Sequence, residues 1–318
     1  MNEPKSQNTH YIPEWLLKRF RHPFLFELDI FTGRVEQRKP KKAASEQDLW
    51  PADIEDGLST FDNQAARIYR NRIEGRQQIV LSDSERMDFA HWLAQFAVRV
   101  PTVRADLHRQ LEEAKADPQT IRRLILKNRP ELLNTIRQNS PGLFDEAVKE
   151  YGKAETEECL LAQMAERFAE SSSIWPTQER IHHDILRNNR SEDYARRFLE
   201  YQWSWIRSRE AFVIGDNPLV RWHEKSQRWN YGINKNNVEI TIPLAHDICL
   251  RLDKRHRKNA DRLMNCSNSQ TRIYNERQRL AAVKFVYGNS HDVLDFINKP
   301  IIGWHPMPDQ PARPDSLP

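Results

Sequence analysis

The sequence of 318 residues contains little glycine, little cysteine and no long apolar run. Nine glycines argue against a glycine-rich phosphate loop, and neither the Walker motif nor the dinucleotide-binding fingerprint is present. The Gly-x-Ser-x-Gly elbow of hydrolases and the His-Glu-x-x-His zinc helix are also absent. The sequence therefore lacks the motifs that identify the common nucleotide-binding proteins, esterases and zinc peptidases.

The three cysteines, Cys159, Cys249 and Cys266, are odd in number and widely spaced, so they fit neither a zinc site nor a disulfide framework. No stretch approaches the roughly 20 apolar residues that cross a bilayer. The first eight residues lack the apolar core of a secretory signal. These features predict a cytoplasmic protein without membrane association.

Charged residues make up 30% of the chain, and the formal net charge is +4. A positive excess suits a nucleic-acid partner, because basic side chains neutralise phosphates. A chain slightly rich in arginine would show the same excess without any such partner, since net charge reports on solubility and non-specific binding rather than on activity. Nucleic acid is therefore one candidate partner, and the sequence leaves open whether there is a protein partner.

The apolar pattern predicts an α+β fold that is mostly helical. Alternating apolar residues over 24–37, with Thr32-Gly33 at the turn, predict a β-hairpin. Further strands are expected near 211–214, 238–242, 247–252 and 283–287. We expect the hairpin to share one small mixed or antiparallel sheet with the strands near 211–214, 238–242 and 283–287, and Pro243 to end the second of these.

Helical periodicity dominates from residue 62 to residue 200, and these helices are expected to pack on one side of the sheet. Ser82 and Glu85 have the spacing of a capping box. Apolar residues then recur at helical spacing, from Phe89 through Trp92 to Phe96. This stripe predicts a core-facing helix that Pro101 interrupts or kinks.

The expected domain organisation has a polar tail over 1–9, one α+β domain over 10–305 and a loose proline-rich tail over 306–318. A helical subdomain is expected at about 117–200, because this stretch contains almost no strand pattern.

Two short segments far apart in the sequence are candidates for chemistry: His10-Tyr11-Ile12-Pro13 and Gly215-Asp216-Asn217-Pro218. The second segment places a carboxylate and an amide directly after a buried-type strand, an edge where functional groups are often held. Asp, Asn and Pro are equally common in ordinary turns, where their side chains bond to nearby backbone. A histidine before a helix also commonly serves as a local hydrogen-bonding residue.

Taken in order along the chain, these segments and several others resemble the bacterial family named domain of unknown function 4238. The residues that carry the resemblance are His10-Tyr11-Ile12-Pro13 with Leu17 and Phe20, Gln95–Pro101, Gly215–Pro218, Ile242-Pro243-Leu244 and Asn275 before the strand at 283–287. The resemblance spans about residues 10 to 288. It implies no established activity, so it informs the limits of the fold more than the function.

The chain departs from the family pattern at two positions. The family usually has Ser where Gly215 stands, so a hydroxyl role is absent there. It also tends to carry Glu near the start of the second helix, where Asp62 is the nearest match in this chain. A carboxylate role is therefore expected at Asp62 only by analogy.

A basic run between residues 251 and 262 is the candidate nucleic-acid contact. The residues expected to bind phosphates are Arg251, Lys254, Arg255, Arg257 and Lys258. Asp253 and Asp261 interrupt the run, and a solvated loop gives the same pattern. Both interpretations stay open at this point.

One hypothesis is that the protein is an enzyme. The residues that would converge on one polar pocket are His10, Arg99, Asp216, Asn217 and Asn275. Asp216 with amide oxygens would hold a hard cation such as Mg²⁺. His10 would act as general base or acid, while Arg99 would stabilise the charge of a phosphate. This set predicts a metal-dependent phosphodiesterase or nuclease, with growth-arresting toxin or anti-phage effector as biological roles.

The alternative hypothesis is a non-catalytic nucleic-acid-binding or protein-interaction module. The same polar residues would then form a buried hydrogen-bond network that joins the N-terminal segment to the late strands. An open cleft containing His10 and Asp216 would favour the enzyme, and a closed core would favour the module.

Overall fold

The computed structural model describes residues 8–116, 177–187, 191–223, 237–254 and 261–298, with a few short pieces between them. The chain divides into two compact units, one formed by residues 1–103 with 183–318 and the other by residues 104–182. Most of the expected subdomain at 117–200 lies outside the described residues, as do residues 1–7 of the N-terminal tail and all of the tail at 306–318. The elements that position the candidate site belong to the first unit.

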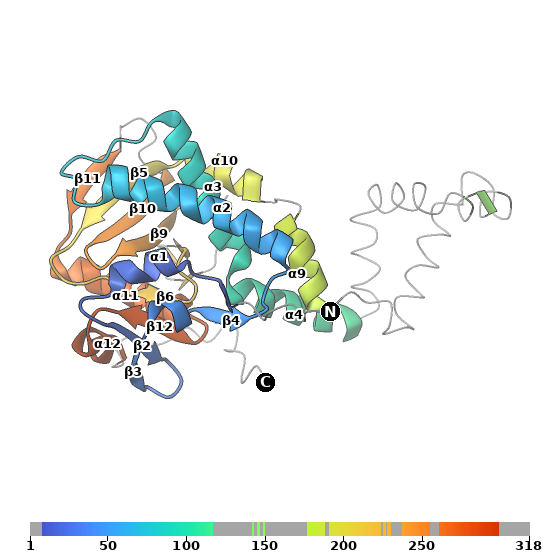
Figure 1. Cartoon of the computed structure of the whole chain (residues 1–318), viewed down its shortest axis with the longest axis horizontal. Coiled ribbons are helices and arrows are strands. Elements are labelled where there is room, and N and C mark those ends of the chain that lie inside the picture. Colours follow the sequence, from blue (N-terminus) through green and yellow to red (C-terminus); the bar gives the residue numbers. More distant parts are fainter. Residues whose placement is uncertain are drawn as a thin grey trace, which may run out of the picture. The chain divides into compact units, whose positions relative to one another are not determined.

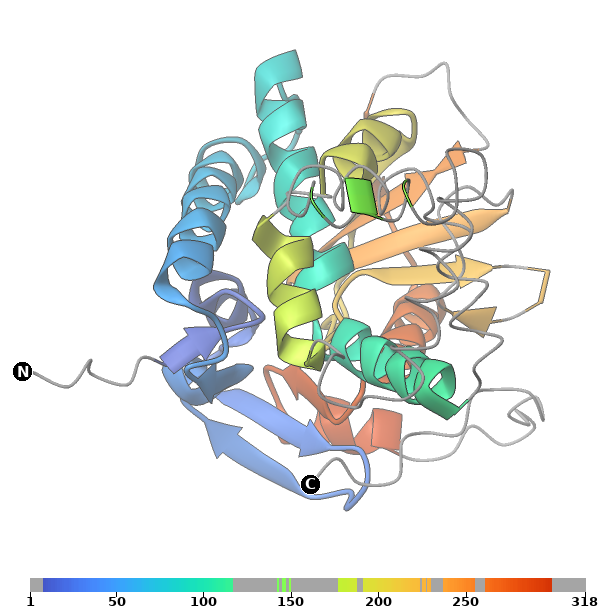
Figure 2. The same ribbon diagram turned by 90° about the vertical axis from the view of Figure 1, so that its right-hand side faces the viewer.

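The first unit contains a six-stranded sheet, whose strands lie side by side in Figure 2. Its order is β11 (Arg262–Asn265), β5 (Gln202–Arg207), β10 (Ile248–Asp253), β9 (Val238–Ala245), β7 (Val220–His223) and β8 (Arg228–Trp229). Neighbours are antiparallel except β11 and β5, which are parallel. All eight residues of β9 are buried, which is typical of a strand covered on both faces.

A separate four-stranded sheet holds the predicted hairpin. Its order is β3 (Val35–Arg38), β2 (Leu25–Asp29), β12 (Phe285–Gly288) and β6 (Ile214–Gly215). The hairpin is confirmed, but the prediction of a single sheet is wrong, because β9 belongs to the six-stranded sheet. Strand periodicity shows which faces are buried and does not show which strands are partners.

Pro243 does not end its strand. It lies inside β9 and faces Cys249, where the register between β9 and β10 shifts next to Ile248. A proline lacks the N–H that a regular ladder uses, and an irregularity in the pairing is one of the places where a sheet tolerates it.

Three helices pack together, with α3 (Asp83–Arg99) against both α2 (Ala52–Ile68) and α10 (Ser191–Leu199); all three are labelled in Figure 1. The capping box at Ser82 and Glu85 is confirmed, and α3 ends before Pro101, where α4 (Pro101–Ala116) begins. Phe89 of α3 packs its ring 6.1 Å from Trp203 and from Trp205 on β5. The α3 stripe is therefore core, as its spacing predicts.

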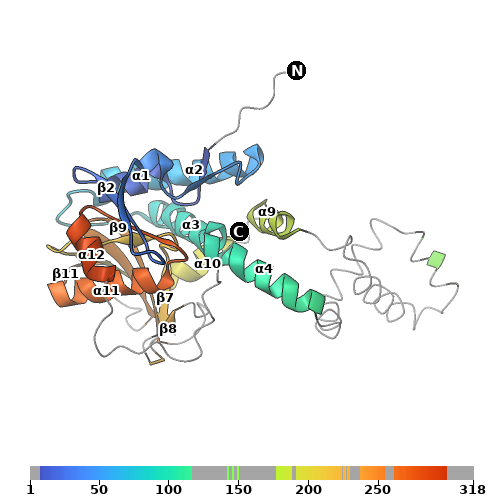
Figure 3. The same cartoon turned by 90° about the horizontal axis from the view of Figure 1, so that it is seen from below.

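Two further helices contact the smaller sheet. Helix α11 (Asn268–Ala281) contacts β6 and also β7 and β8, and α12 (His291–Asn298) packs on β2 and β12; α11 and α12 lie next to each other in Figure 3. At the N-terminal end, β1 (Asn8–His10) pairs with β4 (Ser45–Gln47), and α1 (Glu14–Leu17) follows Pro13. Helix α9 (Gln178–Arg187) completes the described helices. The observed architecture is α+β, and no described helix has both the length and the apolar character needed to cross a bilayer.

Candidate functional site

His10 is held at the end of a short two-stranded ladder, where it lies opposite Ser45. The neighbouring Thr9 hydroxyl fixes this ladder, because it donates to the Glu46 carbonyl at 3.1 Å and accepts from the Leu49 N–H at 3.0 Å. Pro13 then starts α1. The position of His10 is therefore set by backbone pairing on one side and by a helix start on the other.

The two nitrogens of the His10 ring have different surroundings. Nε2 is buried and has no hydrogen-bond partner among the described residues. Burial lowers the pKa of the ring below 6.5, although Glu14 and the carbonyls of Lys41 and Pro40 oppose this shift. Nδ1 is thus the nitrogen available to donate to those carbonyls, which leaves Nε2 with a free lone pair. This is the tautomer that a histidine needs to act as a base.

Arg99, the last residue of α3, is fully buried and pairs with Asp62 of α2. Its Nη2 donates to Asp62 Oδ1 at 3.0 Å and its Nη1 to Oδ2 at 3.2 Å. The Trp92 indole also donates to Asp62 Oδ1 at 3.0 Å. The guanidinium lies 4.4 Å above the ring of Phe96. Asp62, whose side chain is 19% exposed, is therefore held in one orientation while it stays open to solvent.

Glu55 is a second carboxylate near Arg99 and Asp62. It lies seven residues before Asp62 on α2, and seven residues make two helical turns, so both residues share one face. Its Oε2 is buried without a partner in the described part of the chain. Burial raises the pKa of Glu55, and the charge of Arg99 opposes this shift. Because the charge of Asp62 also acts on His10, these four residues form one group, named here the His10 cluster (His10, Glu55, Asp62 and Arg99).

Three exposed lysines flank the His10 cluster. Lys41 and Lys42 lie on the short helix η2 (Pro40–Lys42), and Lys39 precedes it. The carbonyls of this same turn contact the His10 ring. The turn therefore contacts His10 through its backbone, while its lysine side chains are exposed and add positive charge to the surface of this turn.

Asp216 lies in a different environment, where backbone amides use both of its oxygens. Oδ1 accepts from Val283 N–H at 2.6 Å, and Oδ2 accepts from Lys284 and Phe285 N–H at 2.7 and 2.8 Å. Asp216 is only 1% exposed. Burial raises the pKa of its carboxyl to about 6, and the three amides oppose this shift. The carboxylate thus anchors the start of β12.

Hydrogen bonds also join α11 to the backbone before Asp216 and to the side chain of Asn217. Asn275 accepts from Val213 N–H at 3.0 Å and donates to the Ala211 carbonyl at 2.8 Å. Asn217 donates to the Ala281 carbonyl at 3.2 Å. We name this closed network the Asp216 clasp (Asp216, Asn217, Asn275 and Gln278).

Gln278 binds the segment on both sides of Asp216. It accepts from Gly215 N–H at 2.9 Å and donates to the Pro218 carbonyl at 2.9 Å. A Cβ atom at Gly215 would lie 2.9 Å from the Gln278 carbonyl oxygen, so the close approach of this strand to α11 requires glycine.

The structure therefore divides the predicted site in two. His10 and Arg99 gather around Asp62, whereas Asp216, Asn217 and Asn275 belong to the Asp216 clasp. Arg99 pairs with Asp62 and not with Asp216, because Asp62 on the adjacent helix reaches both terminal nitrogens. Among the described residues, no three metal-ligating side chains come together, at Asp216 or elsewhere.

Tyr11 connects the two parts of the divided site. Its hydroxyl shares a hydrogen bond with that of Tyr287, and the charge of Asp216 acts on Tyr11. The Tyr287 hydroxyl in turn accepts from Ala44 N–H at 3.1 Å. Adjacent residues of the His10-Tyr11 motif therefore serve different parts of the molecule.

Sequence reasoning missed Glu55 and the role of the turn at Lys39–Lys42, named here the lysine turn. The heptad spacing between Glu55 and Asp62 is visible in the sequence, yet nothing in it shows that this face of α2 meets Arg99. The contact between the lysine turn and His10 depends on the β1–β4 pairing, and β4 has no clear strand pattern.

Only part of the basic run at 251–262 can be placed. Arg251 lies 3.8 Å from Glu239, and the ammonium of Lys254 lies 5.0 Å from the ring centre of Tyr201. Both side chains therefore have protein partners. Arg255, Arg257 and Lys258 lie outside the described residues. Their expected role in nucleic-acid binding stays a prediction.

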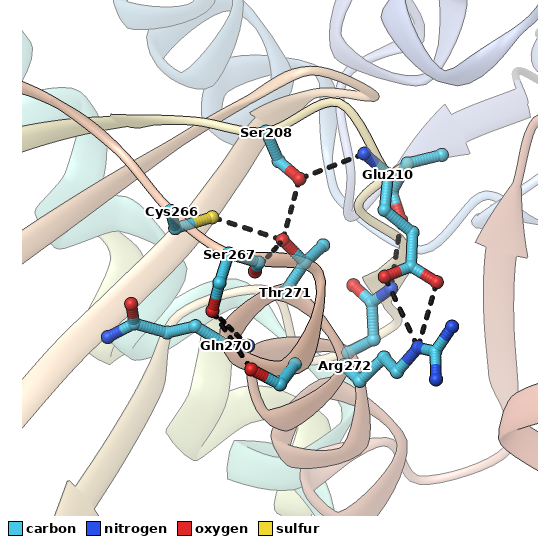
Figure 4. A network of polar contacts seen from close by, with 10 residues as sticks. Ser208, Glu210, Cys266, Ser267, Gln270, Thr271 and Arg272 are labelled. Atoms are coloured by element: carbon cyan, nitrogen blue, oxygen red, sulfur yellow. Dashed lines mark hydrogen bonds and ion pairs between the residues drawn. The ribbon is translucent and has the colours of Figure 1, made fainter.

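A further polar network surrounds the start of α11 (Figure 4). The Thr271 hydroxyl lies 2.6 Å from the Ser208 hydroxyl and 3.0 Å from the Cys266 sulfur, and it donates to the Ser267 carbonyl. Ser267 caps the helix by accepting from Gln270 N–H. These groups satisfy one another, so the network fixes the helix start rather than forming an open site.

The model of a protein family described as "Protein of unknown function (DUF4238)" matches residues 8–292. This match contains both the His10 cluster and the Asp216 clasp. No curated protein and no solved structure gives a significant match to the chain.

Proposed function

The chain belongs to this family of unknown function, and we propose that it is a phosphodiester hydrolase whose catalytic centre is the His10 cluster. The Asp216 clasp has a supporting role in this proposal. It anchors β12, and Tyr287 on that strand contacts the segment that carries His10.

The observation that carries the proposal is the partnerless, buried Nε2 of His10. A buried polar atom without a partner costs about 1–3 kcal/mol, so its persistence calls for a reason such as a ligand or a catalytic role. Burial also favours the neutral ring, which is the form that accepts a proton. A water molecule or a substrate hydroxyl would supply the hydrogen bond that Nε2 lacks.

The charges around His10 suggest the class of substrate. The turn whose carbonyls contact the ring carries three exposed lysines (Lys39, Lys41 and Lys42), whose positive charge suits a phosphate, whereas the charges that act on the ring itself are those of Glu14 and Asp62. In the proposed step, Nε2 removes a proton from water while the water oxygen bonds to phosphorus. The bond from phosphorus to the leaving oxygen breaks, and the protonated His10 returns its proton to that oxygen. Asp62, oriented by Arg99, stabilises the imidazolium in between.

A divalent cation is compatible with this centre. Glu55 and Asp62 are the carboxylates that would hold Mg²⁺, since hard cations prefer oxygen ligands. An assay in Mg²⁺ and in EDTA tests this requirement separately from the role of His10.

The test uses bis(p-nitrophenyl) phosphate, single- and double-stranded DNA, and RNA as substrates. We expect His10→Gln to reduce hydrolysis at least about 100-fold, the usual minimum for loss of a general base. His291→Gln is the matched control, because His291 is an exposed histidine on α12. Full activity in His10→Gln would refute the assignment. Nucleic-acid binding without hydrolysis by the wild type would instead favour a non-catalytic binding module.

A further inference from the structure

A pocket of about 250 Å³ lies in a part of the first unit that contains neither the His10 cluster nor the Asp216 clasp. Its walls come from η1 (Lys18–Phe20), the π-helical turn η3 (Tyr69–Ile73), the end of β5 and the turn between β9 and β10. We name it the Arg19 pocket. Four elements that are distant in sequence therefore meet around one cavity.

The lining of the Arg19 pocket carries a positive excess. Its cations are Lys18, Arg19, Arg21 and Arg207, against the carboxylates Glu74 and Asp247. Four positive charges face two negative ones in the lining, without counting His246, and Glu14 outside the lining pairs with Lys18 at 3.0 Å, so the local excess is one positive charge. A concave surface lined mainly by one sign of charge concentrates ligands of the opposite sign.

Two of the lining arginines keep unused hydrogen-bond donors. Arg19 pairs with Glu74 through Nη1, and Arg207 donates to the Arg76 carbonyl through Nη2. The Nε of each is buried and has no partner among the described residues. Arg21 makes no ion pair with any described residue and is exposed at the rim. Because these Nε atoms are buried, the donors left for a ligand are Nη2 of Arg19, Nη1 of Arg207 and the guanidinium of Arg21.

The wall formed by η3 departs from regular helix geometry. The Glu74 N–H donates to the Tyr69 carbonyl at 2.9 Å, a bond that spans five residues and gives a π-helical turn where α2 ends. Such turns are rare and occur frequently at functional sites. Here the turn brings Tyr69 and Ile73 into the wall, and Gly75 follows with a φ of 66°.

From the charge, the unused donors and the volume, we infer that the Arg19 pocket binds a small phosphate-bearing anion, either free phosphate or a phosphate monoester. Sites for drug-sized ligands usually exceed about 300 Å³, so this cavity suits one phosphate with a small attached group. Arg21 and Arg207 would donate charge-assisted hydrogen bonds to its oxygens. The inference is independent of the proposed hydrolysis.

Isothermal titration of the full chain with inorganic phosphate, and separately with glycerol phosphate as a small monoester, tests this inference. We expect saturable binding with one site and a Kd that rises about tenfold or more in Arg21→Gln and in Arg207→Gln, since each removes a charged hydrogen bond. Arg34→Gln is the control, because it removes one positive charge from the exposed hairpin. His10→Gln should keep the wild-type Kd, which separates this pocket from the proposed catalytic centre.

Tighter binding of glycerol phosphate would identify a monoester as the ligand, and equal or weaker binding of glycerol phosphate would identify free phosphate. The inference is overturned if neither anion gives a saturable signal at constant ionic strength. It is also overturned if Arg34→Gln weakens binding as much as Arg21→Gln does, because the effect would then be one of net charge.

Discussion

Arg99 directs both terminal nitrogens of its guanidinium at Asp62, with Nη2–Oδ1 and Nη1–Oδ2 distances of 3.0 and 3.2 Å. Arg99 is fully buried, whereas the Asp62 side chain is 19% exposed. A buried charge is tolerated when it is paired, and removal of one partner leaves the other uncompensated. Asp62 therefore has a structural task in addition to its proposed role beside His10.

Asp62→Leu should destabilise the protein by about 3 kcal/mol, because Arg99 loses its carboxylate. Arg99→Met should cost a similar amount for the converse reason. The double variant should recover much of the loss, since the buried charges are then replaced by apolar groups. Urea unfolding of the four proteins measures this coupling. Strictly additive losses would show that the two side chains do not stabilise each other.

Gly215→Ala should lower the free energy of unfolding by about 1–3 kcal/mol, because its Cβ would press on the Gln278 carbonyl. Gly57→Ala is the matched control. Gly57 lies within α2, and a Cβ atom at this position would meet no heavy atom within 4 Å, so alanine there should stabilise the helix by up to about 1 kcal/mol. Thermal unfolding of both variants gives the comparison. Opposite signs are expected, and equal melting temperatures would contradict the close approach of β6 to α11.

The Asp216 carboxyl should make stability depend on pH in a defined direction. Burial raises its folded pKa to about 6 from a reference value of 3.8, so between these values the folded protein binds a proton that the unfolded chain has released. The contribution of this group is therefore greatest below pH 4 and is lost as the pH rises to 6.

The variant Asp216→Asn isolates that contribution, because asparagine does not titrate. The stability of the wild type relative to Asp216→Asn should fall by about 3 kcal/mol from pH 4 to pH 7. Urea unfolding at several pH values measures the difference. A rise over the same range would show that the three backbone amides outweigh burial in setting the pKa.

His10 should remain neutral in the folded protein at pH values where it is protonated in the unfolded chain. Burial holds its pKa below 6.5, so this residue lowers the free energy of unfolding as the pH falls below 6.5. Titration of the His10 ring signal by NMR, assigned through its loss in His10→Gln, should give a midpoint below 6.5. A midpoint at or above 6.5 would contradict the burial of Nε2.

The sequence predicted the parts of the fold that depend on local pattern. The capping box at Ser82 and the stripe from Phe89 to Phe96 are decided within a few residues, and both are confirmed. The division into two sheets depends on pairing between strands that are distant in sequence, such as β2 with β12. Alternation of apolar residues contains no information on that partner.

The candidate site likewise depends on contacts between elements that are distant in sequence. The sequence indicated His10 and Arg99, but it placed Arg99 in one pocket with Asp216. Side-chain partners depend on which helix lies alongside, and α2 brings Asp62 to Arg99. The turn interpretation of Gly215–Pro218 is not supported, since Gly215, Asp216 and Asn217 bond to groups 63 to 69 residues further along the chain, on α11 and at the start of β12.

The bond between Ala44 and Tyr287 joins positions that are 243 residues apart. Ribosomes add roughly 5–20 residues per second, so a newly made Ala44 waits about 10–50 seconds for its partner to be synthesised. Until then β2 lacks β12, and the segment behind His10 lacks the tyrosine that closes it. The environment of His10 is consequently completed only after residue 287 has been made, so a growing chain contains His10, Glu55, Asp62 and Arg99 before they are held in their final arrangement.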